Sequence, residues 1–320
     1  MKYFPAFLSV VPAFCLTAFL PFCLSAQNVT IKKNANSDNL IWPLNASGSI
    51  FIGEGAGNVS TGLFNTGVGA YALNLNSTGA SNSAFGNGAL GKVNTGGFNT
   101  AIGSGAMTEN LTGFENTAIG TFSLYNNKGL SRSTAVGFKA MYYANNSTSA
   151  GTTFNTAVGY EALRGSLTAG NNTGINNTAI GDQAMFSTTS GSNNAALGSK
   201  ALYANTTGGQ NTAIGALSLF SNTTGIENMA SGHLALTGNM AGSYNTAVGS
   251  RSMQQSLSGS DNTAVGYYAL FNNNGSSNVA MGSSAMEHNS TGIENTSIGN
   301  ASLYWNTGGS NNVMVGYLAG

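Results

Sequence analysis

Polar and apolar residues recur along the chain in one short pattern, which reads Asn-Thr-Ala-Ile-Gly at both 99–103 and 211–215. A small residue and a large apolar residue then follow, as at Ala106 and Met107. The closing glycines lie 17 residues apart almost everywhere, with spacings of 16 twice and 22 twice. They are Gly53, Gly69, Gly86, Gly103, Gly120, Gly137, Gly159, Gly181, Gly198, Gly215, Gly232, Gly249, Gly266, Gly282, Gly299 and Gly316. A fixed period of this kind is typical of a solenoid, in which one structural unit stacks on the next.

Each unit predicts short β-strands. Side chains alternate along a strand, so Thr117 and Ile119 share one face, which we assign to the core, while Ala118 points to the other face. Gly120 allows a tight corner, and Leu124 is expected to begin a second, inward-pointing strand before a polar link closes the turn. The predicted fold class is therefore all-β: a repeat solenoid, or parallel β-roll, of about sixteen coils. Its asparagines are expected to form a ladder along the stack.

On this assignment, the outer face of the first strand is a column of small residues that lets another backbone approach closely. We therefore predict self-association along this column. Its members include Ala101, Ala118, Ala213, Ala247 and Ala264.

The repeated unit resembles the head repeats of trimeric autotransporter adhesins, the YadA-like head, which are built from serial Asn-Ser-Val-Ala-Ile-Gly units. Residues 278–282 and 312–316 place Val where that family usually has it. The resemblance covers about residues 49–320. It implies a left-handed parallel β-roll, a homotrimer about a common axis with the alanine column facing the partners, and an adhesive role on a bacterial outer surface. The repeats also resemble the shafts of phage-type fibres.

The N-terminal residues suggest export. Residues 1–26 read as a signal peptide, with Lys2 at the start, an apolar run and a small-residue exit at Ala26. Prolines interrupt a run that is already short for a membrane span, so we expect no span in the mature chain. Both cysteines, Cys15 and Cys23, lie in this leader, which leaves neither disulfides nor thiolate ligands after cleavage. Residues 27–48 are expected to cap the first open edge of the repeat array, which spans 49–320.

Composition and motifs point away from catalysis and nucleic acids. The formal net charge is zero, so there is no basic stripe to displace phosphate counterions. The segment 86–91 matches Gly-x-Gly-x-x-Gly, but every unit carries a glycine there and no helical pattern follows, so the repeat explains it. The only histidines, His233 and His288, fall at variable or link positions. We predict no enzyme activity, no cofactor and no metal site.

The two longer units are the exceptions to the period. Five residues are added within 142–153 and five more within 164–174. Being consecutive, these insertions are expected to touch on one edge of the stack. Solenoids carry insertions on one face and recognition commonly lies on loops, so we predict a binding knob with Tyr142, Tyr143 and Arg164 as contact residues. Tolerated loop drift is the alternative.

The predicted function is that of an exported, adhesin-like fibre or head domain that attaches to an unidentified surface or matrix ligand. One alternative is a purely structural fibre shaft that needs a C-terminal chaperone or anchor domain. Another is an ice-binding solenoid that uses the regular threonine column, which includes Thr66, Thr100, Thr117, Thr156, Thr178 and Thr212. The alternation argument turns these threonines toward the core, which speaks against ice binding.

Overall fold

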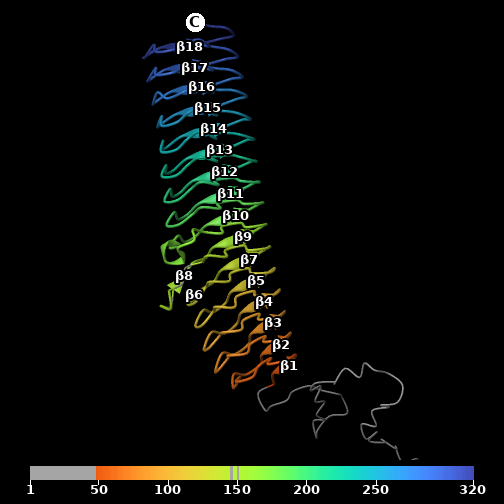
Figure 1. Ribbon diagram of the computed structural model, residues 1–320. Helices are drawn as coiled ribbons and strands as arrows, with labels where there is room; N and C mark the ends of the chain where they lie inside the picture. The colour runs from red at the N-terminus through yellow and green to blue at the C-terminus, as the bar shows by residue number, and fades with distance from the viewer. Residues whose placement is uncertain (1–47, 145–146, 150) are drawn as a thin grey trace, which may run out of the picture. The chain divides into compact units, whose positions relative to one another are not determined.

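The chain forms a stack of short coils in a computed structural model that describes residues 48–144, 147–149 and 151–320 (Figure 1). The expected leader, and the expected cap up to residue 47, lie outside the described residues. The prediction of an all-β parallel solenoid of about sixteen coils is confirmed.

One parallel sheet runs the length of the stack, with sixteen strands in the order β1-β2-β3-β4-β5-β7-β9-β10-β11-β12-β13-β14-β15-β16-β17-β18. Equivalent residues of neighbouring coils pair, so that Thr100 lies opposite Thr117 and Ile102 opposite Ile119. The strands are β1 Ile50–Ile52, β2 Thr66–Val68, β3 Ser83–Phe85, β4 Thr100–Ile102, β5 Thr117–Ile119, β7 Thr134–Val136, β9 Thr156–Val158, β10 Thr178–Ile180, β11 Ala195–Leu197, β12 Thr212–Ile214, β13 Met229–Ser231, β14 Thr246–Val248, β15 Thr263–Val265, β16 Val279–Met281, β17 Thr296–Ile298 and β18 Val313–Val315.

The second strand expected in each coil is a turn instead. Leu124 has φ near 49°, in the left-handed region, where a strand cannot continue. Its side chain is nevertheless buried, as predicted, and its N–H donates to Ala140 O of the next coil at 2.9 Å. Thus each regular coil contributes one strand to the main sheet, and hydrogen bonds along the stack replace the missing strand pairing.

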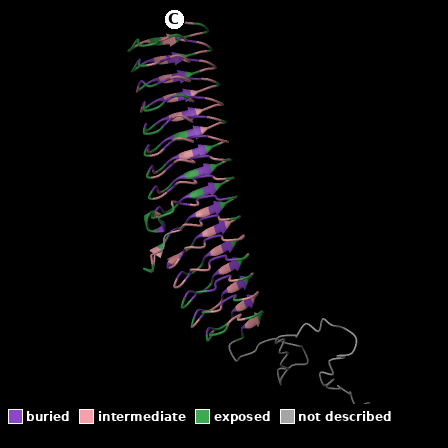
Figure 2. Ribbon diagram, viewed as in Figure 1, coloured by how far each residue is buried: buried purple, intermediate pink, exposed green. Residues whose placement is uncertain are grey.

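The alanine column predicted to face partner chains lies inside the coil, so that assignment was wrong. The side chains of Ala101, Ala118, Ala213, Ala247 and Ala264 have no exposed surface in the single chain. Period-two alternation holds, but in the opposite phase: the alanines point inward, while the threonines and the following Ile or Val point outward (Figure 2).

The limited space inside a coil is one reason why the alanines, and not the isoleucines, point inward. The interior of a coil holds the strand alanine together with the Ala and the Leu or Met that follow the corner, as with Ala101, Ala106 and Met107. The first coil carries a large side chain, Phe51, at the same interior position, and there the next coil has Gly67, where an added Cβ would lie 2.9 Å from the Phe51 ring. An isoleucine at this position in every coil would overfill the stack.

A second cause of the phase is a buried ladder of asparagines four residues before the closing glycines, the strand Asn ladder, in which Ser49 and Ser133 take the place of Asn. The N–H of Asn211 donates to Asn194 Oδ1 at 2.9 Å. The Asn211 amide also donates to Asn194 Oδ1 at 3.2 Å and to Gly225 O at 2.8 Å. Each amide is satisfied by its neighbours, which is the condition for burying it. Since Asn211 and Ala213 are two residues apart, burying one places the other inside.

A parallel series, the link Asn ladder, follows seven residues after the closing glycines. Asn222 donates to Asn205 Oδ1 at 3.0 Å and to Gly225 O at 3.1 Å. Ser60, Val93 and Ser256 replace it in single coils, and its longest interruption covers three consecutive coils, where Ala144, Ser166 and Thr188 occupy the equivalent positions. These are the coils that carry or follow the two insertions.

The closing glycines form a tightly packed column in the stack. Gly215 has φ of 120°, and a Cβ built there would lie 2.6 Å from Gly232 O. Neither the dihedral angle nor the space admits another residue, which accounts for the strict recurrence of glycine at this position.

Candidate functional site: the insertion edge and the outer strand face

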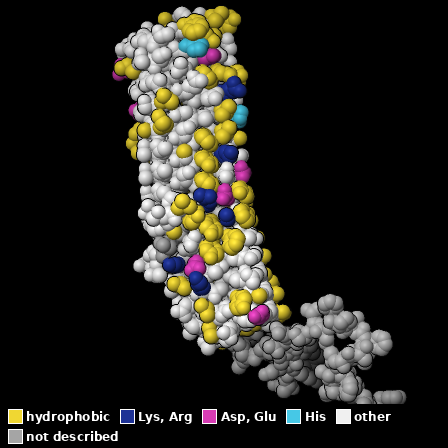
Figure 3. Space-filling view, viewed as in Figure 1, with side chains coloured by type: hydrophobic (Ala, Val, Ile, Leu, Met, Phe, Trp, Pro, Cys, Tyr) yellow, Lys and Arg dark blue, Asp and Glu magenta, His cyan; other side chains and the backbone are white. Residues whose placement is uncertain are grey.

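The outer face of the main sheet carries a column of exposed or partly exposed apolar side chains, one residue before the closing glycine, which is interrupted at Ser231. Ile102 is 41% exposed and Ile214 is 42% exposed. Threonines form the neighbouring column, as at Thr100 and Thr212. Hydrophobic side chains outnumber charged ones along the visible side of the stack (Figure 3). We call this surface the outer strand face; its apolar column is Ile52, Val68, Phe85, Ile102, Ile119, Val136, Val158, Ile180, Leu197, Ile214, Val248, Val265, Met281, Ile298 and Val315.

The two insertions lie against one another on a different part of the coil, the insertion edge. The first contains β8, Gly151–Thr152, which pairs in parallel with β6, Leu130–Ser131, as a small second sheet. The second contains the short 3₁₀ helix η1, Ala169–Asn171. The Asn172 amide of the second insertion donates to Tyr143 O of the first. The expected contact between the insertions is therefore present.

The three residues predicted as contact residues are brought together, but they are half-buried rather than fully exposed. The N–H of Tyr143 donates to Arg164 O at 2.9 Å, and the Arg164 guanidinium carbon lies 5.4 Å from the Tyr143 ring centroid. The Tyr142 ring packs edge-on against Tyr143 at 4.7 Å and stacks on Tyr125 at 5.2 Å. Burial raises the pKa of the Tyr142 phenol above its ordinary value, with a smaller contribution from Tyr125.

Sequence reasoning missed the aromatic residues that continue this stack. Arg164 lies 4.1 Å from the ring centroid of Phe186, which stacks on Tyr203 at 5.0 Å. Tyr203 in turn stacks on Phe220 at 5.1 Å. All of these residues stand five positions after a closing glycine, so the repeat register itself was the signal that could have found them. Phe186, Tyr203 and Phe220 lie in coils of regular length, outside the insertions that drew attention.

Charges on the insertion edge balance locally. Arg164 Nη1 lies 3.3 Å from Glu161 Oε1, and Gln183 Nε2 donates to Glu161 Oε2 at 3.1 Å. Glu161 is almost fully buried, so both of its oxygens need these partners. The ion pair between Arg164 and Glu161 holds the Arg164 guanidinium over the Phe186 ring.

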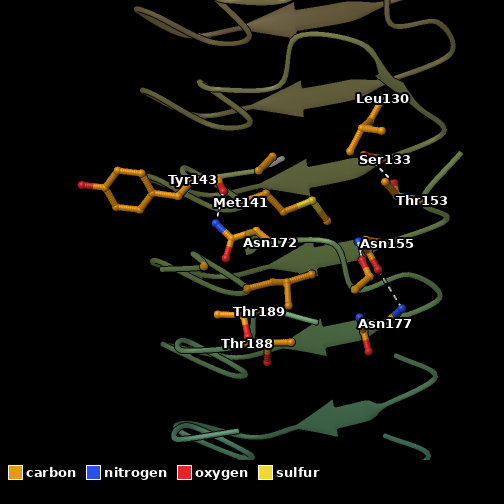
Figure 4. A pocket seen from close by; sticks show the side chains of 14 residues that line it. Leu130, Ser133, Met141, Tyr143, Thr153, Asn155, Asn172, Asn177, Thr188 and Thr189 are labelled. Carbon is orange, nitrogen blue, oxygen red and sulfur yellow. Dashed lines mark hydrogen bonds between the residues drawn. The ribbon is translucent and has the colours of Figure 1, made fainter. Parts of the chain in front are cut away.

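A small recess opens where the link Asn ladder is missing, with a volume of about 30 Å³ (Figure 4). Met141, Asn155 and Thr188 are among the residues that line it. Thr188 is 4% exposed, and its Oγ1 has no hydrogen-bond partner among the described residues. The side chains drawn in Figure 4 come from several successive coils, so the recess crosses the stack rather than belonging to one turn.

Elsewhere in the described part of the chain, no group of three or more His, Cys, Asp or Glu side chains is arranged to hold a metal ion. His288 stacks on Trp305 with ring centroids 4.2 Å apart. Among the described residues there is also no helix of the length and apolarity that crossing a membrane requires.

No protein-family model matches the chain, and no curated protein matches it significantly. The arguments for function therefore rest on the geometry of the outer strand face and of the insertion edge.

Proposed function

We propose that the chain is an exported attachment protein of a cell surface, in which the solenoid is the rigid shaft and head, and that it assembles as a homotrimer through the outer strand face. The observation that carries the proposal is the unbroken run of outward residues along all sixteen strands of the main sheet, most of them Ile, Val, Leu, Met or Phe. An exposed apolar surface of this length is typical of a protein-protein interface.

The dimensions of the face suit such an interface. Sixteen strands spaced by about 4.8 Å make a face about 75 Å long. A contact strip about 10 Å wide would cover about 750 Å² per chain, close to the roughly 800 Å² that one partner contributes to a standard interface, and a trimer would divide this area between two neighbours. Burial of the half-exposed Ile and Val side chains would supply the driving force.

The test of assembly is the solution mass, measured by light scattering on a sizing column. We expect three chains per particle for the natural protein and one chain for Ile102→Asp/Ile214→Asp, which places two charges on the apolar column. The matched control is Ser104→Asp/Asn300→Asp, which adds the same charge at exposed positions just after the corner. If the natural protein is a single chain, the proposed assembly is wrong.

The test of attachment uses beads coated with the natural protein and incubated with cell monolayers or extracellular matrix. Shortening 142–153 and 164–174 by five residues each restores the regular period. We expect this variant to keep the circular dichroism spectrum of the natural protein and to lose attachment. Attachment that survives the shortening would place the adhesive surface elsewhere, and a natural protein that attaches to nothing would favour the structural shaft.

Ice binding is a second candidate, because the threonines point outward and the sequence-based argument against it no longer holds. Thr178 is exposed, and Thr100 and Thr212 are partly exposed on a regular parallel sheet. The threonine and apolar columns share one face, so a chain that trimerises through it has no free ice-binding surface. A single chain per particle together with thermal hysteresis in dilute solution would support ice binding in place of the proposed assembly.

A further inference from the structure

Two recesses meet on the insertion edge. The inner one is the recess of about 30 Å³ at Thr188, and the outer one is an open groove of about 500 Å³ beside the second insertion. Gly165 and Thr189 line both of them, so the inner recess lies at the wall of the groove. We call the two together the insertion groove.

The inner recess offers a polar group that the protein leaves unsatisfied. A volume of about 30 Å³ holds about two waters, or one hydroxymethyl group of similar size. Thr188 Oγ1 is buried and unpartnered, and a buried hydroxyl of this kind costs free energy until it finds a partner. A ligand hydroxyl that entered the recess would satisfy it.

The outer groove is polar but carries no net charge. Its one cation, Arg164, is already paired with Glu161, and the remaining lining residues are uncharged. Hydroxyls and one amide come from Ser166, Thr168, Ser187, Thr189, Thr206 and Asn171. The Thr189 hydroxyl donates to Thr206 O at 3.0 Å and so keeps its lone pairs for a ligand donor.

Apolar surface lines the same groove. Leu167 is 74% exposed, and Phe186 lies beneath the Arg164 guanidinium. A ligand that matches this lining presents hydroxyls on its edges and C–H groups on its faces, which is the chemistry of a pyranose ring. A phosphate or sulfate would need an unpaired cation, and a purely apolar ligand would leave the hydroxyls of the groove without partners.

We propose that the insertion groove binds one unit of a neutral saccharide, with a hydroxyl or hydroxymethyl group in the inner recess beside Thr188 and the ring lying along Leu167 and against the edge of Phe186. The two faces of the Phe186 ring are covered by Arg164 and Tyr203. The inference rests on the proposed attachment function and names its ligand class.

Most coils of regular length place an asparagine of the link Asn ladder where Thr188 stands, as at Asn205 and Asn222. The exceptions, Val93 and Ser256, do not line the groove. The groove therefore belongs to the interrupted coils, not to the repeat.

The test is binding of the full protein to an array of neutral, sialylated and sulfated oligosaccharides, followed by titration of the strongest neutral binder. Thr188→Asn restores the ladder residue and fills the inner recess, so it should abolish binding without disturbing the fold. Thr189→Val removes a hydroxyl that lines the groove and should weaken binding about tenfold, the effect of losing one hydrogen bond of about 1.4 kcal/mol.

The matched control is Thr223→Val. The Thr223 hydroxyl donates to Met240 O at 2.9 Å in the same way as that of Thr189 does to Thr206, but it lies outside the groove. This variant should bind like the natural protein. The proposal is overturned if no neutral saccharide binds, if only acidic ones bind, or if the three variants bind equally. The bead assay measures attachment independently of the oligosaccharide array. If the coated beads attach but the protein binds no neutral saccharide, the saccharide proposal is wrong and the proposed attachment function still holds.

Discussion

Replacing Asn211 by alanine tests the energetics of the strand Asn ladder. The Asn211 side chain donates to Asn194 Oδ1 and to Gly225 O, and its Oδ1 accepts from both the N–H and the amide of Asn228. Most partners keep another hydrogen bond after the substitution: Gly225 O still accepts from Asn222, and the Asn228 amide still donates to Gly242 O. The backbone N–H of Asn228 loses its acceptor while it remains buried.

Four lost hydrogen bonds at a net ~0.5–1 kcal/mol each, with about 1–2 kcal/mol for the unpaired N–H, give a destabilisation of about 3–6 kcal/mol. Urea unfolding followed by far-ultraviolet circular dichroism, at a fixed protein concentration, measures it. The control is Asn300→Ala at an exposed position where other coils carry Ala70 and Ala216, and it should change the free energy of unfolding by less than about 0.5 kcal/mol. A loss below about 1 kcal/mol for Asn211→Ala would show that the ladder is not a main source of stability.

The other predictions concern the corner, the interrupted ladder and a buried phenol. Gly215→Ala should destabilise the fold by more than about 3 kcal/mol in the same urea assay, because the added Cβ would clash with Gly232 O. The control is Gly88→Ala, which should destabilise the fold by only about 1 kcal/mol, because the atom nearest to its added Cβ is 3.9 Å away. Thr188→Asn should raise the unfolding free energy by about 1 kcal/mol by extending the link Asn ladder from Asn205, and a decrease would contradict the ladder account. The pKa of Tyr142 is raised in the folded chain, so its phenolate absorbance should appear above pH 10.0. The stability from keeping this phenol neutral is fully present below pH 10.0 and is lost as the pH rises through the folded value; a Tyr142→Phe variant with the same alkaline loss of stability would contradict this.

The period alone was enough to predict the fold class and the number of coils, because stacking is the only way in which such small units bury their apolar residues. It was not enough to predict which face of the strand points inward. Thr117-Ala118-Ile119 alternates equally well in either phase. Hydrophobicity favoured isoleucine inside, whereas the space inside the coil admits alanine and excludes isoleucine.

The deciding signal was present in the asparagines. Asn116 and Ala118 are two residues apart and share a face, and an asparagine ladder along the stack is most stabilising where water is excluded. The turn at Leu124 was beyond sequence reasoning, because leucine rarely takes left-handed dihedral angles and does so here only under the constraint of neighbouring coils.

For the insertion edge, the position of the insertions in consecutive coils correctly predicted that they touch, as Asn172 and Tyr143 do. The role of Tyr142, Tyr143 and Arg164 in binding stays a prediction. The absence of a link asparagine at Thr188 can be read from the repeat register, but the recess beside Thr188 depends on how the two loops pack, which the sequence pattern does not give.

The longest interruption of the link Asn ladder, over three successive coils, is expected to weaken the coupling between the coils on either side, although the strand pairing of the main sheet continues across it. Each coil contacts only its neighbours, so weak coupling at one place lets the parts on either side fold and unfold separately. Under a pulling force along the axis of the stack, we expect the coils at this interruption, which we call the seam, to unfold before the coils on either side. One 22-residue coil that unfolds there would extend the chain by about 75 Å. Single-molecule stretching should show this short step first, and a single all-or-none rupture would argue against the seam. A protein that holds a cell to a surface in flowing water would thereby carry its own extensible joint beside the groove proposed to bind the ligand.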